Sequence, residues 1–149
     1  FYHNGKLLQG NKSITYESKS TELLATEHPV MTFTVDMKIT FDDGKVYSRT
    51  GTTVKETIEG NETPLNWEDN VFLVTGNSAT SLANGDTVTT VITTPLRYIT
   101  SCKLPFPVRG IVSITKNTSV GTLDFGDGKC DNLGTLTIDG VTKDINLEK

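Results

Sequence analysis

The stretch MTFTVDMKITF, residues 31–41, places an apolar side chain at every odd position and a polar one at every even position. Successive side chains of a β-strand point to opposite faces, whereas a helix repeats every 3.6 residues, so this pattern predicts a strand with one buried and one solvated face. The sequence DDG at residues 42–44 then predicts a hairpin turn, because Gly44 can adopt a positive φ. The returning segment 45–58 is poorer in apolar residues, and we expect it to form an exposed or edge strand.

Turn signals recur along the rest of the chain and separate short strand-like segments. They are Asn4-Gly5, Gly60-Asn61, Asn84-Gly85, Asp127-Gly128 and Asp139-Gly140. This spacing suits consecutive antiparallel hairpins, since parallel strands need long crossover connections for which there is no room. We therefore expect one all-β domain over residues 1–149, an antiparallel meander of about eight to ten strands that is closed as a barrel or folded as a sandwich. The best helix candidate is the short segment 20–27.

The composition supports β structure and argues against several classes of function. About a sixth of the residues are threonine, whose branched Cβ suits a half-exposed pleated sheet. A net charge of −4 argues against nucleic-acid binding, which needs concentrated positive charge. No run approaches the roughly 18 apolar residues of a membrane-spanning helix, so we expect no transmembrane segment. Motifs such as Gly-x-Ser-x-Gly or a phosphate-binding loop are missing from the sequence, and we expect no catalytic activity.

Several motifs in the second half of the chain follow a familiar order. They are VFLVTG (71–76), ITTPLR (92–97), Cys102, VRG (108–110), DFGDGKCDN (124–132) and KDINL (143–147). This order resembles the C-terminal region of a group of secreted or outer-membrane lipoproteins of Bacteroidetes bacteria, which carry the string Asp-Tyr/Phe-Gly-Asp-Gly-x-Cys-Asp-Asn. The resemblance is good from Gly44 onward and looser before it. It implies an exported protein, secreted or held at the outer membrane or cell surface, and a chain that is the C-terminal part of a longer one.

The two cysteines, Cys102 and Cys130, are 28 positions apart. In the oxidising compartment that the resemblance implies, we expect them to form an intramolecular disulfide. The alternative is two separate buried thiols. A metal site is not expected at the cysteines, because the two histidines of the chain lie at no ligand-like spacing from them.

Three carboxylates, Asp124, Asp127 and Asp131, lie close together around the second cysteine. With backbone carbonyls they offer oxygen ligands of the kind that Ca²⁺ binds, and the glycines between them would let the chain curl around an ion. The spacing is not that of an EF-hand, however. We favour the alternative of a hairpin in which the aspartates cap their own backbone amides, and keep Ca²⁺ as the one candidate cofactor.

The only tryptophan, Trp67, lies in a polar segment with Asn66 and Asp69. A sugar-binding surface typically combines an aromatic ring that stacks on the sugar with amide and carboxylate groups that form hydrogen bonds with its hydroxyls. A tryptophan between apolar neighbours such as Leu65 and Phe72 more often closes one end of a β core, however. These three residues are therefore candidates for glycan binding, with a structural role as the alternative.

Residues 86–88, Asp-Thr-Val, resemble the short sequence at which Bacteroidetes attach O-glycans, so Thr87 is a candidate glycosylation site. The function that we expect from these observations is a non-catalytic exported β domain, a structural or protein-interaction module at the bacterial cell surface. Its partners would be other surface or outer-membrane proteins. A module that binds a small ligand or glycan through the Trp67 loop is the alternative.

Overall fold

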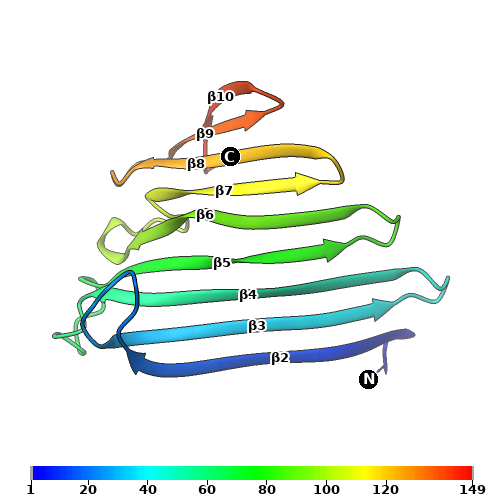
Figure 1. The fold of residues 1–149 in the computed structure, drawn as a ribbon, viewed down its shortest axis with the longest axis horizontal. Helices are drawn as coiled ribbons and strands as arrows, with labels where there is room; N and C mark the ends of the chain where they lie inside the picture. The colour runs from blue at the N-terminus through cyan, green and yellow to red at the C-terminus, as the bar shows by residue number, and fades with distance from the viewer. Residues whose placement is uncertain (1, 149) are drawn as a thin grey trace.

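The computed structural model describes residues 2–148, which form one antiparallel sheet (Figure 1). The strands are β1 (Tyr2–His3), β2 (Lys6–Lys19), β3 (His28–Thr40), β4 (Val46–Glu59), β5 (Val71–Ser81), β6 (Thr87–Ile99), β7 (Arg109–Lys116), β8 (Ser119–Asp127), β9 (Leu133–Ile138) and β10 (Val141–Asn146). Each strand pairs with the next one along the chain, so the predicted all-β antiparallel meander is confirmed. The order runs from β1 to β10 without closing on itself, so the sheet is not a barrel.

Helical structure within residues 2–148 is limited to one 3-10 turn, η1 (Thr100–Cys102). The segment 20–27 forms an irregular loop, and the helix considered for it was wrong. In this loop the Thr21 hydroxyl accepts hydrogen bonds from the backbone N–H groups of Leu23 and Leu24, and the Thr21 N–H donates to the Leu24 carbonyl, which makes a local turn that no helix continues. No helix of the described chain has the length and apolar character needed to cross a membrane.

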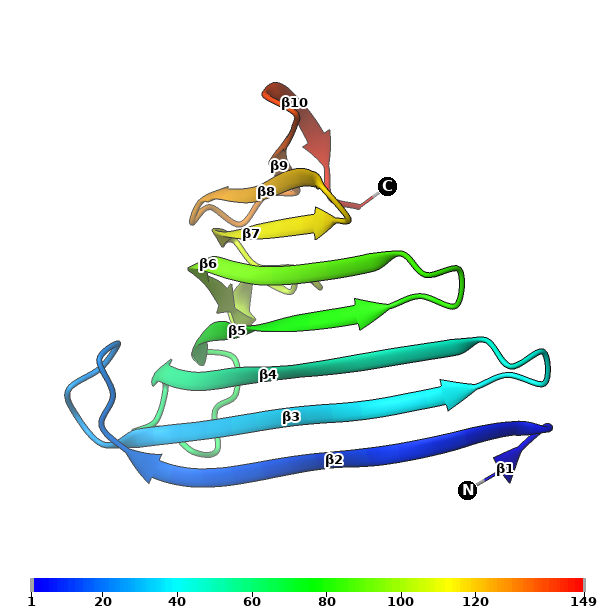
Figure 2. The ribbon, with the colours of Figure 1, turned by 45° about the vertical axis from the view of Figure 1, so that its right-hand side comes forward.

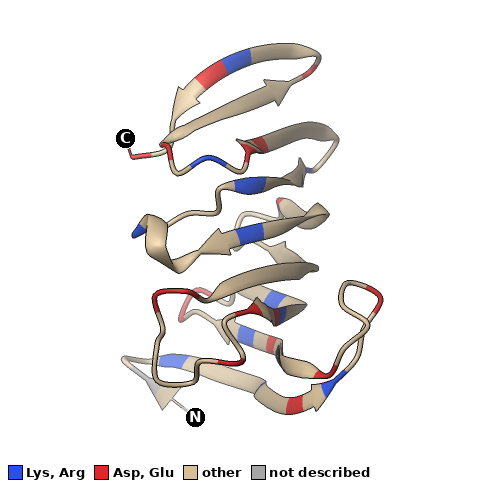
Figure 3. Cartoon of the chain, turned by 90° about the vertical axis from the view of Figure 1, so that its left-hand side faces the viewer, with Lys and Arg blue, Asp and Glu red and all other residues tan. Residues whose placement is uncertain are grey.

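The strand β4 lies inside the sheet, paired with β3 on one side and β5 on the other. Of the two expectations for this segment, the edge strand is therefore wrong, while an exposed strand agrees with side chains that are half-buried or exposed at every position but Glu56. Its low apolar content has another cause: most of the sheet is a single layer of strands, so even an inner strand meets solvent on both faces. Figure 3, viewed from the end that carries the long loops, shows the strands following one another in one twisted layer.

The register of the strands gives the sheet two chemically different faces. Residues that are directly opposite on neighbouring strands share a face, so the odd positions of β3 lie with the even positions of β2 and β5. We call this side the apolar face; it carries Ile14, Tyr16, Met31, Phe33, Val35, Met37, Ile39, Phe72, Val74 and Tyr98. The other side, the threonine face, carries Thr15, Thr32, Thr34, Thr50, Thr52, Thr75 and Thr89.

The three longest connections lie together at one end of the sheet, while the short turns lie at the other (Figures 1 and 2). They are the loops 20–27, 60–70 and 100–108. Burial is concentrated at this end: the buried hydrophobic residues of the described chain are Val30, Val71, Leu96, Val108 and Val112. On the apolar face, by contrast, the side chains of β3 are only half-buried, and Ile14 and Tyr16 on β2 are 64% and 65% exposed.

The predicted disulfide is present between Cys102 and Cys130, whose Cα atoms are 5.3 Å apart. Cys102 ends η1, in the loop before β7, and Cys130 lies in the loop after β8. The bond therefore links two loops across the β7–β8 hairpin. It closes a covalent ring that contains this hairpin and the buried residues Val108 and Val112.

Replacing both cysteines by serine should lower the free energy of unfolding by roughly 3–4 kcal/mol, because the unfolded chain regains the freedom that the cross-link removes. Urea unfolding followed by circular dichroism measures the change. A reducing agent should produce a similar loss in the wild-type protein and none in the double variant. An unchanged unfolding midpoint in the double variant would contradict the prediction.

Candidate functional site: an aromatic surface at the loop end of the apolar face

The loop 60–70 between β4 and β5 is held in shape by its own polar groups. The carboxylate of Asp69 accepts hydrogen bonds from the hydroxyl of Thr63 and from the side-chain amide of Asn66, at 2.5 and 3.1 Å. The Asn66 side-chain oxygen in turn accepts from the backbone N–H of Glu68. Asn66 and Asp69, predicted as ligand-binding residues, are thus brought together, and both take part in building the loop.

Trp67 projects from this loop with 73% of its surface exposed, and it does not close a core. Its neighbour Leu65 is 96% exposed, so the apolar flank that favoured a structural role is itself in solvent. Trp67 forms one wall of a hollow of about 330 Å³ on the apolar face. Opposite it, the walls come from four different strands and include Tyr16, Met31 and Phe72.

A second hollow of about 610 Å³ adjoins the first and shares the side chains of Lys55 and Phe72 with it. The Lys55 ammonium lies 3.8 Å from the centre of the Phe72 ring, a cation–π contact. Tyr98 and Leu104 line the far side. Burial raises the pKa of the Tyr98 phenol, so this hydroxyl stays protonated at neutral pH.

Together the two hollows form a surface on which rings can stack and apolar groups can dock. The Lys55 ammonium is common to both hollows, and the larger one is also lined by Lys103 and Glu68, which lie 3.9 Å apart. Sequence reasoning found Trp67 but missed Tyr16, Phe72 and Tyr98. These side chains come from β2, β5 and β6, and only the register of the strands brings them to the same end of the same face. The alternation along each strand was the available signal, but it does not give the register between strands.

Each of the three candidate Ca²⁺ ligands accepts a hydrogen bond from a backbone N–H two residues later in the chain. Asp124 accepts a hydrogen bond from the backbone of Gly126, Asp127 from that of Lys129, and Asp131 from that of Leu133. These are the self-capping turns that the alternative interpretation predicted. Asp127 also pairs with the Lys129 ammonium at 2.8 Å, which lowers the pKa of this carboxyl. Within residues 2–148 no three acidic, histidine or cysteine side chains are grouped as a metal site would require.

Thr87, the candidate glycosylation site, is the exposed first residue of β6. Its backbone N–H donates to the side chain of Asn117, and its carbonyl accepts from the Asn117 N–H. Asp86 binds the same asparagine and lies 3.2 Å from the Lys116 ammonium. The segment is thus a well-ordered turn at the end of the sheet opposite the aromatic surface, and its side-chain hydroxyl faces solvent.

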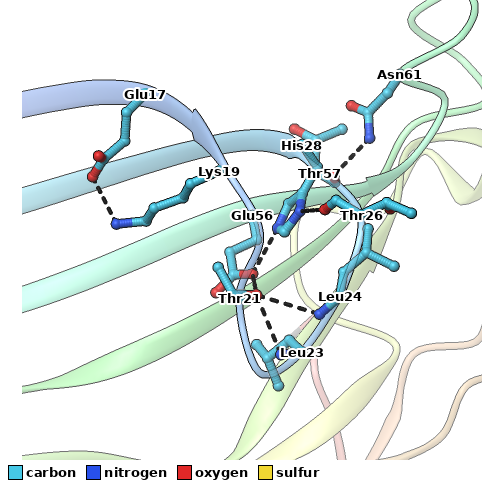
Figure 4. A network of polar contacts seen from close by, with 10 residues as sticks. All are labelled: Glu17, Lys19, Thr21, Leu23, Leu24, Thr26, His28, Glu56, Thr57 and Asn61. Carbon is cyan, nitrogen blue, oxygen red and sulfur yellow. Dashed lines mark hydrogen bonds and ion pairs between the residues drawn. The ribbon is translucent and has the colours of Figure 1, made fainter.

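A buried polar pair that the sequence did not suggest lies on the threonine face, under the loop 20–27 (Figure 4). His28 is 1% exposed and Glu56 is 5% exposed. The imidazole Nε2 lies 2.9 Å from the Glu56 carboxylate, and Nδ1 lies 2.7 Å from the carbonyl oxygen of Thr26. The hydroxyl of Thr21 donates to the same carboxylate oxygen at 2.6 Å.

Both neighbours of the imidazole are hydrogen-bond acceptors, which a neutral ring with its single N–H cannot satisfy at once. Burial opposes the charged form, but the hydrogen bonds to Thr26 and Glu56 and the charge of Glu56 outweigh it, so the pKa of His28 is raised above its usual 6.5. In its charged form the ring donates at both nitrogens and links the loop 20–27 to β3 and β4. The pair is thus a buried link between this loop and the two strands.

Comparison with known proteins gives no match to a family model, to a curated protein or to a solved structure.

The stability of the protein should decrease as the pH rises through the folded-state pKa of His28. A raised folded pKa means that the folded state binds the proton more tightly, so this contribution is complete below about pH 6.5 and is lost above the folded pKa. Urea unfolding at a series of pH values from about 5.5 to 8.5 measures it. His28→Gln should be less stable at low pH and should lose most of this dependence; parallel curves for the two proteins would contradict the prediction.

Trp67 is the only tryptophan, so its fluorescence reports directly on this surface. Because it is 73% exposed, emission from the native protein should lie close to that of the unfolded protein, and a neutral quencher such as acrylamide should reach it readily. Leu65→Ala should leave the emission unchanged. A native spectrum shifted strongly to the blue, with protection from quenching, would show that the ring is buried.

Proposed function

We propose that this chain is a non-catalytic, exported β domain that serves as a structural or protein-interaction module at a bacterial cell surface. The observation that carries the proposal is the open apolar face. Half of the side chains of β3 form an apolar row, and that row has no second layer of strands over it in residues 2–148. An apolar face of this width is typical of a surface that another protein covers.

The exposed area of the chain supports the same conclusion. The structure exposes 9662 Å². A compact monomer of 16.2 kDa is expected to expose about 7,500 Å². The excess of roughly 2,200 Å² is more than twice the ~800 Å² that each partner buries in a standard protein–protein interface. A protein layer across the apolar face would bring the exposure into the normal range.

We propose a non-catalytic role because the residues best suited to acid–base chemistry take part in holding the fold together. His28 and Glu56 are buried under a loop, with no route for a substrate. The aspartates of the loop 124–131 cap backbone amides. The surface-exposed location and the export of the chain rest on the resemblance of its motifs to Bacteroidetes lipoproteins.

The proposal predicts contacts with protein on one face of the sheet. A photo-crosslinking amino acid at Val35, on the apolar face, should form adducts with other proteins in the cell envelope. The same amino acid at the neighbouring position Asp36 points to the threonine face and is the matched control. Adducts from Val35 and few from Asp36, compared by gel shift after irradiation, would support the proposal. Equal adducts from both positions, or none from either, would contradict it.

A second function, the binding of a small ligand or glycan, is favoured by one specific observation. The Trp67 ring is exposed beside a hollow that also contains Tyr16 and Phe72, and aromatic rings of this kind stack on sugar rings. Asn66 and Asp69, next to the ring, supply polar groups on the same loop. This function is compatible with the first, because the hollows occupy only the loop end of the apolar face.

Titration of the protein with a panel of oligosaccharides, followed by Trp67 fluorescence and by calorimetry, tests the second function. For any sugar that binds, Trp67→Ala should weaken the affinity about 2- to 12-fold, the effect of losing one stacking contact of ~0.5–1.5 kcal/mol. Leu65→Ala, at a still more exposed position of the same loop, should leave the affinity unchanged. No response to any sugar, or equal losses in both variants, would argue against glycan binding at this site.

A further inference from the structure

We propose that the apolar face docks an acidic, apolar segment of a partner protein over the middle of the sheet, with its carboxylates against Lys12 and Arg49. This inference rests on the proposed protein-interaction function and adds the chemistry of the partner. It concerns the centre of β2 to β5, away from the aromatic hollows at the loop end. Three features of this region carry it: a hollow at Gly51, the sign of the charges, and the area that is left uncovered.

The hollow at the centre of the face exists because β4 has a glycine there. Gly51 lies between Val35 of β3 and Ser78 of β5. A Cβ at this position would come within 2.7 Å of the Asn77 carbonyl oxygen and of the Ser78 Cβ, so the site does not accept a side chain of its own. The resulting hollow measures about 340 Å³, and its apolar walls include Ile14, Phe33, Val35 and Met37. An aromatic or branched aliphatic side chain of a partner fits such a space as an anchor.

The charges around this hollow all have the same sign. The charged side chains that β2 to β5 direct to the apolar face are Lys6, Lys12, Arg49 and Lys55. The carboxylates of the same strands, Glu17, Asp36, Glu56 and Glu59, belong to the threonine face. Lys12 and Arg49 line the hollow, are exposed, and form no ion pair within the described chain. A partner that supplies carboxylates there gains charge-assisted hydrogen bonds that this chain does not provide for itself.

The sign of the charges also distinguishes between occupants. A second copy packed face to face would bring Lys12 and Arg49 close to the cations of its twin, and like charges in an interface are unfavourable. A lipid layer would have to accept Arg49 in the middle of an inner strand, where its charge would meet acyl chains. An acidic protein segment avoids both difficulties, and the uncovered area is sufficient for a protein interface.

The test uses a defined probe, because the natural partner is not required. A soluble peptide of about ten residues that alternates glutamate with leucine should bind to the folded chain, and the same peptide with lysine in place of glutamate should not. The double variant Lys12→Glu/Arg49→Glu should weaken binding of the glutamate peptide at least about tenfold, and added salt should weaken binding to the wild-type protein. The matched control is Lys38→Glu, an exposed cation of β3 on the threonine face, which should bind as the wild type does.

Several outcomes would overturn the inference. Equal affinity for the two peptides, no binding of either, or equal losses in the double variant and in Lys38→Glu would each exclude docking by charge at this place. Dimerisation in analytical ultracentrifugation that Val35→Glu abolishes would assign the face to a second copy. Binding to phosphatidylglycerol vesicles in preference to the glutamate peptide would assign it to a lipid surface. If the glutamate peptide does not bind while a cross-linker at Val35 still captures protein, the proposed interaction function is supported and only the acidic character of the partner is rejected.

Discussion

The alternation of apolar and polar side chains along β3 is the constraint on which the rest of the structure depends. It places every second side chain on one side of the sheet. The register then places residues of the neighbouring strands on the same side; Ile14 of β2, for example, lies directly opposite Phe33. Such a face is normally buried under a second layer. In residues 2–148 that cover exists only where loops fold back, so the apolar row from Met31 to Ile39 is left half-exposed.

The meander topology explains why burial is confined to one end. In a sheet of sequential hairpins, alternate connections return to the same end, and here the long ones all fall on that side. The loop 20–27 covers His28 and Glu56 on the threonine face. The loop 60–70 lies at the apolar face, where Trp67 lines a hollow that the loop does not fill. The disulfide ties the third long loop to the segment after β8. One end of the sheet is therefore packed and cross-linked, and the middle depends on cross-strand pairing alone.

The sequence predicts those features that depend on local signals. Alternation and glycine turns were sufficient for the antiparallel meander, whereas the disulfide was expected from the two cysteines together with the export that the resemblance implies. For β2 the sequence gives only the turn at Asn4-Gly5 and no strand bounds, because Gly10 and Lys12 interrupt the apolar alternation between Leu8 and Ile14; pairing with β3 makes this segment a strand. The low apolar content of β4 suggested an edge for a related reason, since a single-layer sheet does not require apolar side chains on its inner strands.

The candidate site could be predicted only in part, and the reason is again the register. Trp67 was identifiable from its polar neighbours, but whether it was exposed depended on the path of a loop that the sequence does not determine. Tyr16 and Phe72 are 56 positions apart in the chain and come together because β2, β3, β4 and β5 are paired with a particular alignment. A slip of one residue in any of these pairings would move one of the rings to the threonine face. Contacts of this kind depend on the fold as a whole.

The two neighbouring residues Lys55 and Glu56 show how the sheet separates two tasks. Strand geometry sends them to opposite faces: Glu56 is buried with His28 beneath a loop, while Lys55 lies against Phe72 between the two open hollows. The carboxylate thus contributes to folding, and the ammonium group remains available at a surface. A related division runs along β2 to β5: every charged side chain on the apolar face is a cation, whereas the carboxylates of these strands all lie on the threonine face, together with Lys19 and Lys38. The net charge of −4 consequently gives the wrong sign for the face most suited to binding, because a partner meets the charges of one face and not the sum over the chain.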